Sequence, residues 1–374
     1  MRKNTCVWGL LLLLSLCGCA SPKKETTLAN LKSEDPVGVM KEGTRSEFSG
    51  GYLMEIGNET SMMVFFDSET KTLVPLCSKP DCNHANESCT AILLADEAVR
   101  MCVYDGKLWY INGNEFNELT VWRADTTGEN AEKMFALEGM IGQGNIVLYD
   151  GFLYIRTEKL CMNDLKLIEG KEEGIYRVNM ENGEITETGE KQRVDRLTRL
   201  ILGYFDQKIY LQFTAQSEAY PEGAVIAYDC ETGEMSRVAL RECEMVSAGM
   251  NSGCLVYSGY GEETSFTAVV DLKTGEELEY VPSEFTGNVT MMGKEAILGI
   301  DGEEYCFDFE ERTLEKLENE DMRSKFSPFW SDADGYLGYL IERDYLTEVA
   351  YISKDDYQKG KEPVTLTRNG LPIG

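Results

Sequence analysis

Short apolar segments recur along the chain, and each follows a tight turn. Tyr-Asp-Gly begins two of them, at residues 104–110 and 149–154, where aromatic and aliphatic side chains follow the glycine. Asp-Gly between apolar flanks predicts a β-hairpin turn, because glycine adopts the positive φ angle of that turn without strain. Looser copies of the segment lie at residues 205–210, 250–255, 292–297 and 333–337. The pattern therefore predicts a series of similar β-hairpins.

A second segment alternates with the first. In it an apolar strand ends in Asp or Asn and leads into a turn, often Thr-Gly-Glu. Full copies lie at residues 121–129, 175–184, 226–234 and 269–276, and shorter ones at residues 64–67 and 306–308. Successive copies are roughly 40 to 58 residues apart, which leaves room for about four short strands in each unit. The strands are rich in Tyr, Val, Ile, Leu and Phe, which suit pleated, half-buried surfaces.

Four short strands per repeat of this length are typical of the blade of a β-propeller. One blade cannot bury its own faces, whereas a closed ring of blades buries them and leaves few open strand edges. We therefore predict an all-β fold, a β-propeller of about seven four-stranded blades, within a domain over residues 48–374. Six or eight blades are the alternative counts, and a β-sandwich or two β domains are the alternative folds. The predicted units are residues 48–76, 103–138, 147–190, 203–241, 248–282, 288–318 and 329–367.

Residues 1–18 have the layout of a secretory signal peptide. Arg2 and Lys3 form a positive start, residues 7–16 form an apolar run, and a small residue precedes Cys19. An apolar run of about ten residues is too short to cross ~30 Å of hydrocarbon as a helix, which takes roughly 20 residues. A permanent membrane span is therefore the weaker alternative.

The end of this leader resembles the bacterial lipobox through Leu16, Gly18 and Cys19. The resemblance implies cleavage before Cys19 and a lipoprotein with a diacylglycerol on the sulfur of Cys19, with acyl chains such as palmitate. An ordinary signal peptide that is cut nearby is the alternative. Two acyl chains hold a protein stably at a membrane. We expect residues 19–47 to form the lipidated start and a flexible linker, and we expect the protein on the extracytoplasmic face of the cell membrane.

The charge of the chain narrows the choice of partners. The formal net charge is -29 at pH 7, and 43% of the residues are hydrophobic, which is ordinary for a globular protein. A surface with this charge repels polyanions, so nucleic acids are excluded as expected partners. Solubility explains the charge in one interpretation, and a cationic or polybasic partner explains it in another.

Three cysteines and the only histidine of the chain lie close together in the sequence. Cys77, Cys82, His84 and Cys89 follow the spacing Cys-x4-Cys-x-His-x4-Cys. Thiolates and imidazole are preferred ligands of zinc, and a structural zinc site is closed by four of them. Disulfides that also involve Cys102 are the alternative for an exported chain, as are reduced structural cysteines. In each interpretation the role of the group is structural.

The same segment carries a family resemblance. A Cys-x4-Cys-x-His-x4-Cys segment after a first strand, in a lipobox protein with Asp-Gly-x-Leu-Tyr repeats, resembles a group of surface lipoproteins of anaerobic, mostly Gram-positive bacteria. Their bodies are similar to the β-propellers of TolB and of the low-density-lipoprotein receptor. The resemblance implies a fold and a location, and it defines no activity and no functional residue for this chain.

The sequence favours binding over catalysis. Apart from His84 there is no imidazole for a Ser-His-Asp arrangement, and no Gly-x-Ser-x-Gly, His-Glu-x-x-His or phosphate-binding glycine loop is present. We expect a non-catalytic binding or scaffold module with a protein or glycan ligand. One alternative is a carbohydrate-active enzyme that uses paired carboxylates in the propeller channel. Another is a subunit of an envelope assembly or sensing complex.

Overall fold

The computed structural model describes the chain between residues 36 and 372, with short gaps. The predicted signal peptide, Cys19 and the first part of the predicted linker lie outside the described residues. The described ranges are 36–41, 45–48, 51–56, 61–77, 79, 82, 84, 89–93, 98–114, 118–138, 140–142, 144–159, 162–163, 166–167, 171–187, 192–194, 199–213, 223–285, 287–317, 322, 324–342, 345–368 and 371–372.

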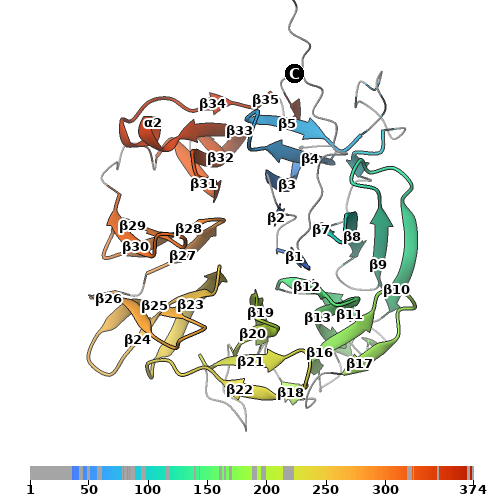
Figure 1. Cartoon of the computed structure of the whole chain (residues 1–374), viewed down its shortest axis with the longest axis horizontal. Helices are drawn as coiled ribbons and strands as arrows, with labels where there is room; N and C mark the ends of the chain where they lie inside the picture. Colours follow the sequence, from blue (N-terminus) through green and yellow to red (C-terminus); the bar gives the residue numbers. More distant parts are fainter. Residues whose placement is uncertain are drawn as a thin grey trace, which may run out of the picture.

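Seven antiparallel sheets of four main strands surround a central axis, which confirms the predicted seven-bladed propeller (Figure 1). Each blade runs outward in chain order, from an inner first strand to an outer fourth strand. Blade 1 holds β2 (Arg45–Phe48), β3 (Gly51–Ile56), β4 (Ser61–Asp67) and β5 (Thr72–Pro75). Blade 2 holds β7 (Ala98–Tyr104), β8 (Lys107–Asn114), β9 (Glu118–Ala124) and β10 (Glu132–Glu138). Blade 3 holds β12 (Ile146–Tyr149), β13 (Phe152–Lys159), β16 (Lys171–Asn179) and β17 (Ile185–Glu187).

The remaining four blades follow the same plan. Blade 4 holds β19 (Arg199–Phe205), β20 (Lys208–Phe213), β21 (Val225–Asp229) and β22 (Met235–Arg237). Blade 5 holds β23 (Glu244–Asn251), β24 (Cys254–Tyr260), β25 (Ser265–Asp271) and β26 (Glu277–Ser283). Blade 6 holds β27 (Val289–Met292), β28 (Glu295–Ile300), β29 (Glu303–Asp308) and β30 (Thr313–Lys316). Blade 7 holds β31 (Phe326–Ser331), β32 (Gly335–Glu342), β33 (Tyr345–Ser353) and β34 (Val364–Thr365), with the short helix α2 (Lys354–Gln358) after β33.

Eight minor strands either pair with a blade strand or form separate two-stranded sheets. They are β1 (Val37–Met40), β6 (Ile92–Leu93), β11 (Met140–Gly142), β14 (Met162–Asn163), β15 (Lys166–Leu167), β18 (Gln192–Val194), β35 (Thr367–Arg368) and β36 (Leu371–Pro372). The separate two-stranded sheets are β14 with β15 and β35 with β36. Among the described residues, no helix reaches the length and apolar character that crossing a lipid bilayer requires.

The two kinds of turn predicted from the sequence recur among the blades. Asp105 and Gly106 both have positive φ angles, 50° and 67°, and join the first two strands of blade 2. In the turn after the third strand of blade 4, Asp229 Oδ1 accepts hydrogen bonds from the backbone N–H groups of Glu231 and Thr232. Such carboxylate-capped turns need Asp or Asn at their first position, which explains the recurrent strand ending.

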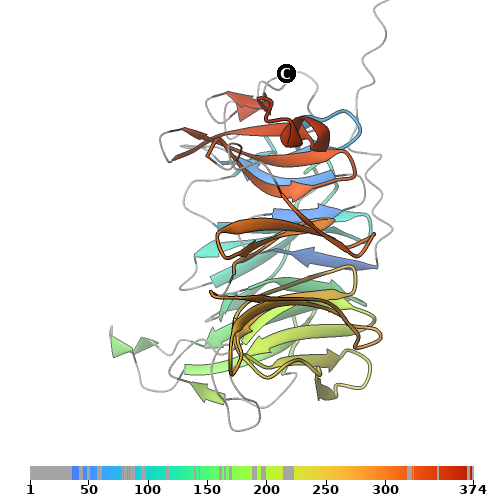
Figure 2. The same ribbon diagram turned by 90° about the vertical axis from the view of Figure 1, so that its left-hand side faces the viewer.

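The ring has two different faces. Turns between first and second strands, and between third and fourth strands, lie on one face, which we call the turn face. Connections between blades, and loops between second and third strands, lie on the opposite face, which we call the crossing face. The alternation follows from four antiparallel strands in each blade, and the view turned by 90° shows strands running across the thickness of the ring (Figure 2).

Part of the predicted linker over residues 19–47 is built into the ring. β1 pairs with β12 in antiparallel register, from Val37 opposite Tyr149 to Met40 opposite Ile146, and so adds a fifth strand on the channel side of blade 3 (Figure 1). Met40 is fully buried between blades 2 and 3. Since β12 ends at the turn face, the chain enters the ring from that face.

Blades 1 and 7 close the ring, and among the described residues their sheets share no strand. Phe66 stacks on Tyr351, with ring centroids 5.5 Å apart, and meets Trp330 edge-on at the same distance. Lys71 Nζ lies 2.7 Å from Asp332 Oδ2 and 4.9 Å from the centre of the Tyr351 ring. Aromatic pairs of this kind contribute about 0.5–1.5 kcal/mol each beyond the area they bury. The closing contact is therefore made of side chains from both ends of the propeller.

Candidate metal centre and channel

The connection from β5 to β6 carries the predicted metal ligands, and both of its ends are fixed to one residue of β4. Leu76 N donates to Met63 O at 3.0 Å, and Met63 N donates to Ala91 O at 2.8 Å. Thr90 Oγ1 also donates to Leu76 O at 3.3 Å. The segment between Leu76 and Ala91 therefore starts and ends beside the same strand, on the crossing face of the ring.

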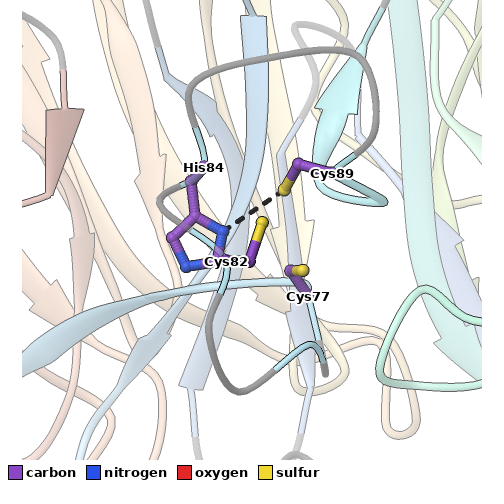
Figure 3. Close-up of side chains that lie close together, drawn as sticks. All are labelled: Cys77, Cys82, His84 and Cys89. Atoms are coloured by element: carbon purple, nitrogen blue, oxygen red, sulfur yellow. Dashed lines mark hydrogen bonds between the residues drawn. The ribbon is translucent and has the colours of Figure 1, made fainter.

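The structure brings all four predicted ligands together. The donor atoms of Cys77, Cys82, His84 and Cys89 all lie within 4.8 Å of one another, and their side chains point toward a common centre (Figure 3). His84 Nδ1 lies 3.2 Å from Cys89 Sγ. With zinc–sulfur bonds of about 2.3 Å, tetrahedral ligands are about 3.8 Å apart, so a small contraction would close the site. The arrangement fits a closed Cys₃His zinc site.

Local backbone turns make this convergence possible. Cys82 N donates to Lys79 O at 3.1 Å, which closes a turn between the first two ligands. His84 has a positive φ angle of 52°, which turns the chain back between Cys82 and Cys89. Cys89 is buried against the core shared by blades 1, 2 and 7, and Cys77 and Cys82 pack against the same core. The site is thus attached to the interior of the ring.

The thiols differ in their electrostatic surroundings. Burial raises the pKa of Cys89 to about 11. Burial alone would raise the pKa of Cys77 as well. Hydrogen bonds from the Lys79 backbone and the Thr90 side chain have the larger effect, so the pKa of Cys77 lies below its ordinary value. Burial lowers the pKa of His84, which favours the neutral imidazole that ligates metals.

Cys102 does not join this group. It is fully buried in the core between blades 2 and 3, together with Met40 and Trp109. Among the described cysteines, Cys77, Cys82, Cys89 and Cys102 all carry free thiols. A disulfide would use only two of the three clustered sulfurs, whereas a tetrahedral metal uses all four donors. The geometry therefore favours the metal over the disulfide interpretation.

A cavity of about 430 Å³ lies in the channel, and sequence reasoning did not identify its residues. Strands β1, β2, β19, β20, β23 and β27 supply much of its wall, including Val39, Leu200, Gln212 and Met291. Among the described residues that line it, Glu47 is the only carboxylate, and it forms an ion pair with Lys41. Inner strands from blades far apart in the sequence meet here, so no local motif marks the cavity.

Comparison with known proteins supports the fold and leaves the activity open. No family model and no curated protein matches this sequence. The structure resembles the Pyrococcus horikoshii acylaminoacyl peptidase, with 12% identity and a TM-score of 0.50 over 85% of this chain. The match covers 50% of the peptidase chain, so this protein spans half the length of that enzyme. At this level of identity the similarity shows the propeller fold alone.

Two further solved structures are more distantly similar. Oligogalacturonate lyase in complex with manganese is 13% identical, with a TM-score of 0.47, and the match covers 84% of this chain and 90% of the lyase. TolB from Acinetobacter baumannii is 12% identical, with a TM-score of 0.40, and the match covers 75% of this chain and 66% of TolB.

Proposed function

We propose that this protein is a lipid-anchored, non-catalytic binding module on the extracytoplasmic face of the cell membrane. In this proposal the propeller channel receives a protein or glycan ligand, and zinc bound by Cys77, Cys82, His84 and Cys89 stabilises the connection between blades 1 and 2. The observation that carries the proposal is the composition of the channel cavity. Its described lining contains one carboxylate, that of Glu47, which forms an ion pair with Lys41.

The same observation weighs against the carbohydrate-active alternative. Glycoside hydrolysis normally uses two carboxyl groups that face each other about 5 to 10 Å apart. The described wall of the cavity supplies Glu47 alone, beside apolar side chains and the amides of Asn145, Gln212 and Asn251. Amides and apolar surface bind and orient a ligand without supplying a general acid or base. His84, the only imidazole of the chain, belongs to the metal cluster.

The anchor would orient the ring. In the proposal, Cys19 carries the diacylglycerol and the following residues lead to β1. Val37, the first residue of β1, lies opposite Tyr149 at the turn face. The turn face is then directed toward the membrane side and the crossing face away from it.

The proposal can be tested on the channel and the anchor together. Leu200 lines the cavity and is half-buried, so Leu200→Trp should fill part of the cavity. We expect the substitution to abolish binding of the glycan or protein that the native protein retains on a glycan array or after photo-crosslinking in intact cells. Val364→Trp, at an exposed position of blade 7, is the control.

Incorporation of labelled palmitate should be lost in Cys19→Ala. Turnover of a substrate that survives purification and is lost in Leu200→Trp would contradict the non-catalytic role. Palmitate labelling that persists in Cys19→Ala would contradict the anchor.

A further inference from the structure

Exposed apolar side chains are concentrated on blade 5. Six large hydrophobic side chains are exposed among the residues that the structure describes, and four of them belong to blade 5 or to the connection that leaves it. These four are Val246, Tyr260, Tyr280 and Phe285. Tyr280, on the outer strand, is covered by the guanidinium of Arg241 at 4.1 Å from the ring centre. The other three, Val246, Tyr260 and Phe285, are exposed to 48%, 49% and 69%.

Strand register places these three residues on one face of the ring. Tyr260, at the end of β24, lies opposite Glu244, the first residue of β23, and this end of the blade is at the crossing face. Val246 occupies the bulge at which the register of β23 shifts, close to the same end. Phe285 follows Ser283, the last residue of β26, where the chain crosses toward blade 6. All three therefore belong to the crossing face.

Phe285 is held in place although it is 69% exposed. The backbone N–H groups of Glu284 and Phe285 donate to Asp301 Oδ1, at 2.9 and 3.1 Å. Asp301 belongs to the turn between the second and third strands of blade 6 and has a positive φ angle of 51°. Ser258 Oγ, from blade 5, donates to Gly287 O at 2.6 Å on the other side of Phe285. An exposed aromatic ring on a fixed backbone loses little conformational entropy when a partner covers it.

Acidic side chains surround these apolar groups. Exposed carboxylates precede β23, occupy the loop after β24 and adjoin Phe285; they are Glu242, Glu244, Glu262, Glu263 and Glu284. Between residues 241 and 288 the only basic residues are Arg241 and Lys273. Arg241 donates to both carboxylate oxygens of Glu277, at 2.6 and 2.7 Å, and Lys273 lies in a turn on the turn face. The crossing face of blade 5 is therefore strongly negative.

The negative charge of the crossing face of blade 5 indicates which kind of partner it can bind. A second copy of this chain would bring like charges together, and so would nucleic acid or an anionic membrane. A basic segment would gain attraction from the five glutamates and could cover the apolar side chains with its own. Interfaces of this kind combine a buried aromatic centre with a charged rim.

We propose that the crossing face of blade 5 is a docking surface for a basic protein segment that carries apolar side chains between lysines or arginines. The blade 5 surface consists of Val246, Tyr260 and Phe285 with Glu242, Glu244, Glu262, Glu263 and Glu284. The inference rests on the proposed binding function and adds a second contact region, outside the channel. It also agrees with the position of Val37 at the turn face, which is opposite the crossing face.

Fluorescence anisotropy with defined peptides tests the proposal. The probe is a labelled peptide in which lysines alternate with phenylalanines, and two matched probes carry serine in place of phenylalanine or glutamate in place of lysine. We expect the whole protein to bind the first probe, and either change in the probe to weaken binding by about tenfold or more. The double variant V246S/F285S should weaken binding by a similar factor. The double variant E262Q/E263Q should weaken it and reduce its dependence on salt.

A matched control removes exposed apolar groups elsewhere. Ile185 in blade 3 and Val364 in blade 7 are exposed to 42% and 65%, so I185S/V364S should leave binding of the probe unchanged. Equal binding by V246S/F285S and the native protein would overturn the docking surface and leave the proposed role of the channel, which Leu200→Trp tests separately. An equal loss in I185S/V364S, or no binding of the lysine–phenylalanine probe at all, would also overturn it. So would binding to neutral phosphatidylcholine vesicles that V246S/F285S abolishes, because the surface would then be a membrane contact.

Discussion

The four residues of the metal cluster could be predicted from the sequence, but the choice between a metal site and a disulfide could not. The residue types and their spacing predict a zinc site because thiolates and imidazole are the ligands zinc prefers. Sequence left the disulfide alternative open, since any two nearby cysteines of an exported chain can pair. Two backbone hydrogen bonds bring the ends of the segment together: Leu76 N donates to Met63 O, and Met63 N donates to Ala91 O. These bonds join residues from separate strands and leave no mark in the local sequence.

Substituting single cluster residues tests whether they bind a metal, and substituting a cysteine outside the cluster provides the control. We expect the protein to bind one equivalent of zinc, and Cys82→Ser or His84→Ala to lose it, because each removes one of four converging donors. Loss of the metal should lower the free energy of unfolding by about 2 kcal/mol or more. Metal analysis and thermal unfolding of the same samples provide the measurement. Cys243→Ser, a half-buried cysteine of another blade, should keep the zinc, and equal zinc content in all variants would contradict the site.

The surroundings of Asp271, in the turn after β25, predict how the stability of the fold depends on pH. Burial alone would raise the pKa of Asp271, but hydrogen bonds from the Thr274 and Lys273 backbone and the guanidinium of Arg312 outweigh it and lower the pKa. A lowered pKa in the folded state means that the stabilisation is complete above the unfolded pKa of about 4 and is lost as the pH falls through the folded pKa.

Asp271→Asn isolates this contribution. Asn179 occupies the equivalent turn of blade 3 and accepts backbone hydrogen bonds from Glu181 and Asn182, so an asparagine keeps the turn. We expect Asp271→Asn to lower stability by about 1 kcal/mol at pH 7, through loss of the charged interactions. Urea unfolding of both proteins between pH 7 and the acid limit should show the difference shrinking below about pH 4. A difference that is constant with pH would contradict the assignment.

At the scale of elements, the blades could be predicted and the added strand β1 could not. Asp-Gly and Thr-Gly-Glu turns act locally, so Gly106 and Asp229 mark their hairpins in any context. β1 has no turn of this kind, and its partner β12 comes much later in the chain. Its four residues, Val-Gly-Val-Met, lie within a mostly polar stretch, so the sequence predicts a linker there.

Gly38 tests whether β1 is tightly packed in the channel wall. A Cβ atom at Gly38 would lie 2.8 Å from Cys102 Sγ and 3.0 Å from Tyr104 Cβ. We expect Gly38→Ala to destabilise the protein by about 1–3 kcal/mol, because the core there has no room for an added methyl group. Cys102→Ala removes the nearer atom, so the double variant G38A/C102A should lose less stability than the sum of the single variants. Additive losses in chemical denaturation would contradict the contact between β1 and β7.

At the scale of the whole molecule, the ring is a series of blades that each pack on their neighbours. The buried side chains form separate clusters between adjacent blades, and the cluster at blade 1 also contains Trp330 and Tyr351 of blade 7. In the described part of the chain the sheets of blades 1 and 7 share no strand, and side-chain packing, the ion pairs of Lys71 and contacts of β36 with β5 join them. Composition and repeat spacing predict a closed ring, but they do not predict which contact closes it.

Phe66 and Phe307 provide a matched test of this closure. Both phenylalanines are fully buried; Phe66 lies between Trp330 and Tyr351 at the closing contact, whereas Phe307 packs in the cluster of blades 5 and 6. Each substitution by alanine should cost about 3–5 kcal/mol of global stability. Native-state hydrogen exchange should nevertheless distinguish them, because local opening follows the contacts that are lost. We expect Phe66→Ala to lower protection in blades 1 and 7, at opposite ends of the chain, and Phe307→Ala to lower it in blades 5 and 6. The same uniform loss of protection in both variants would contradict this expectation, because the ring would then open only as a whole.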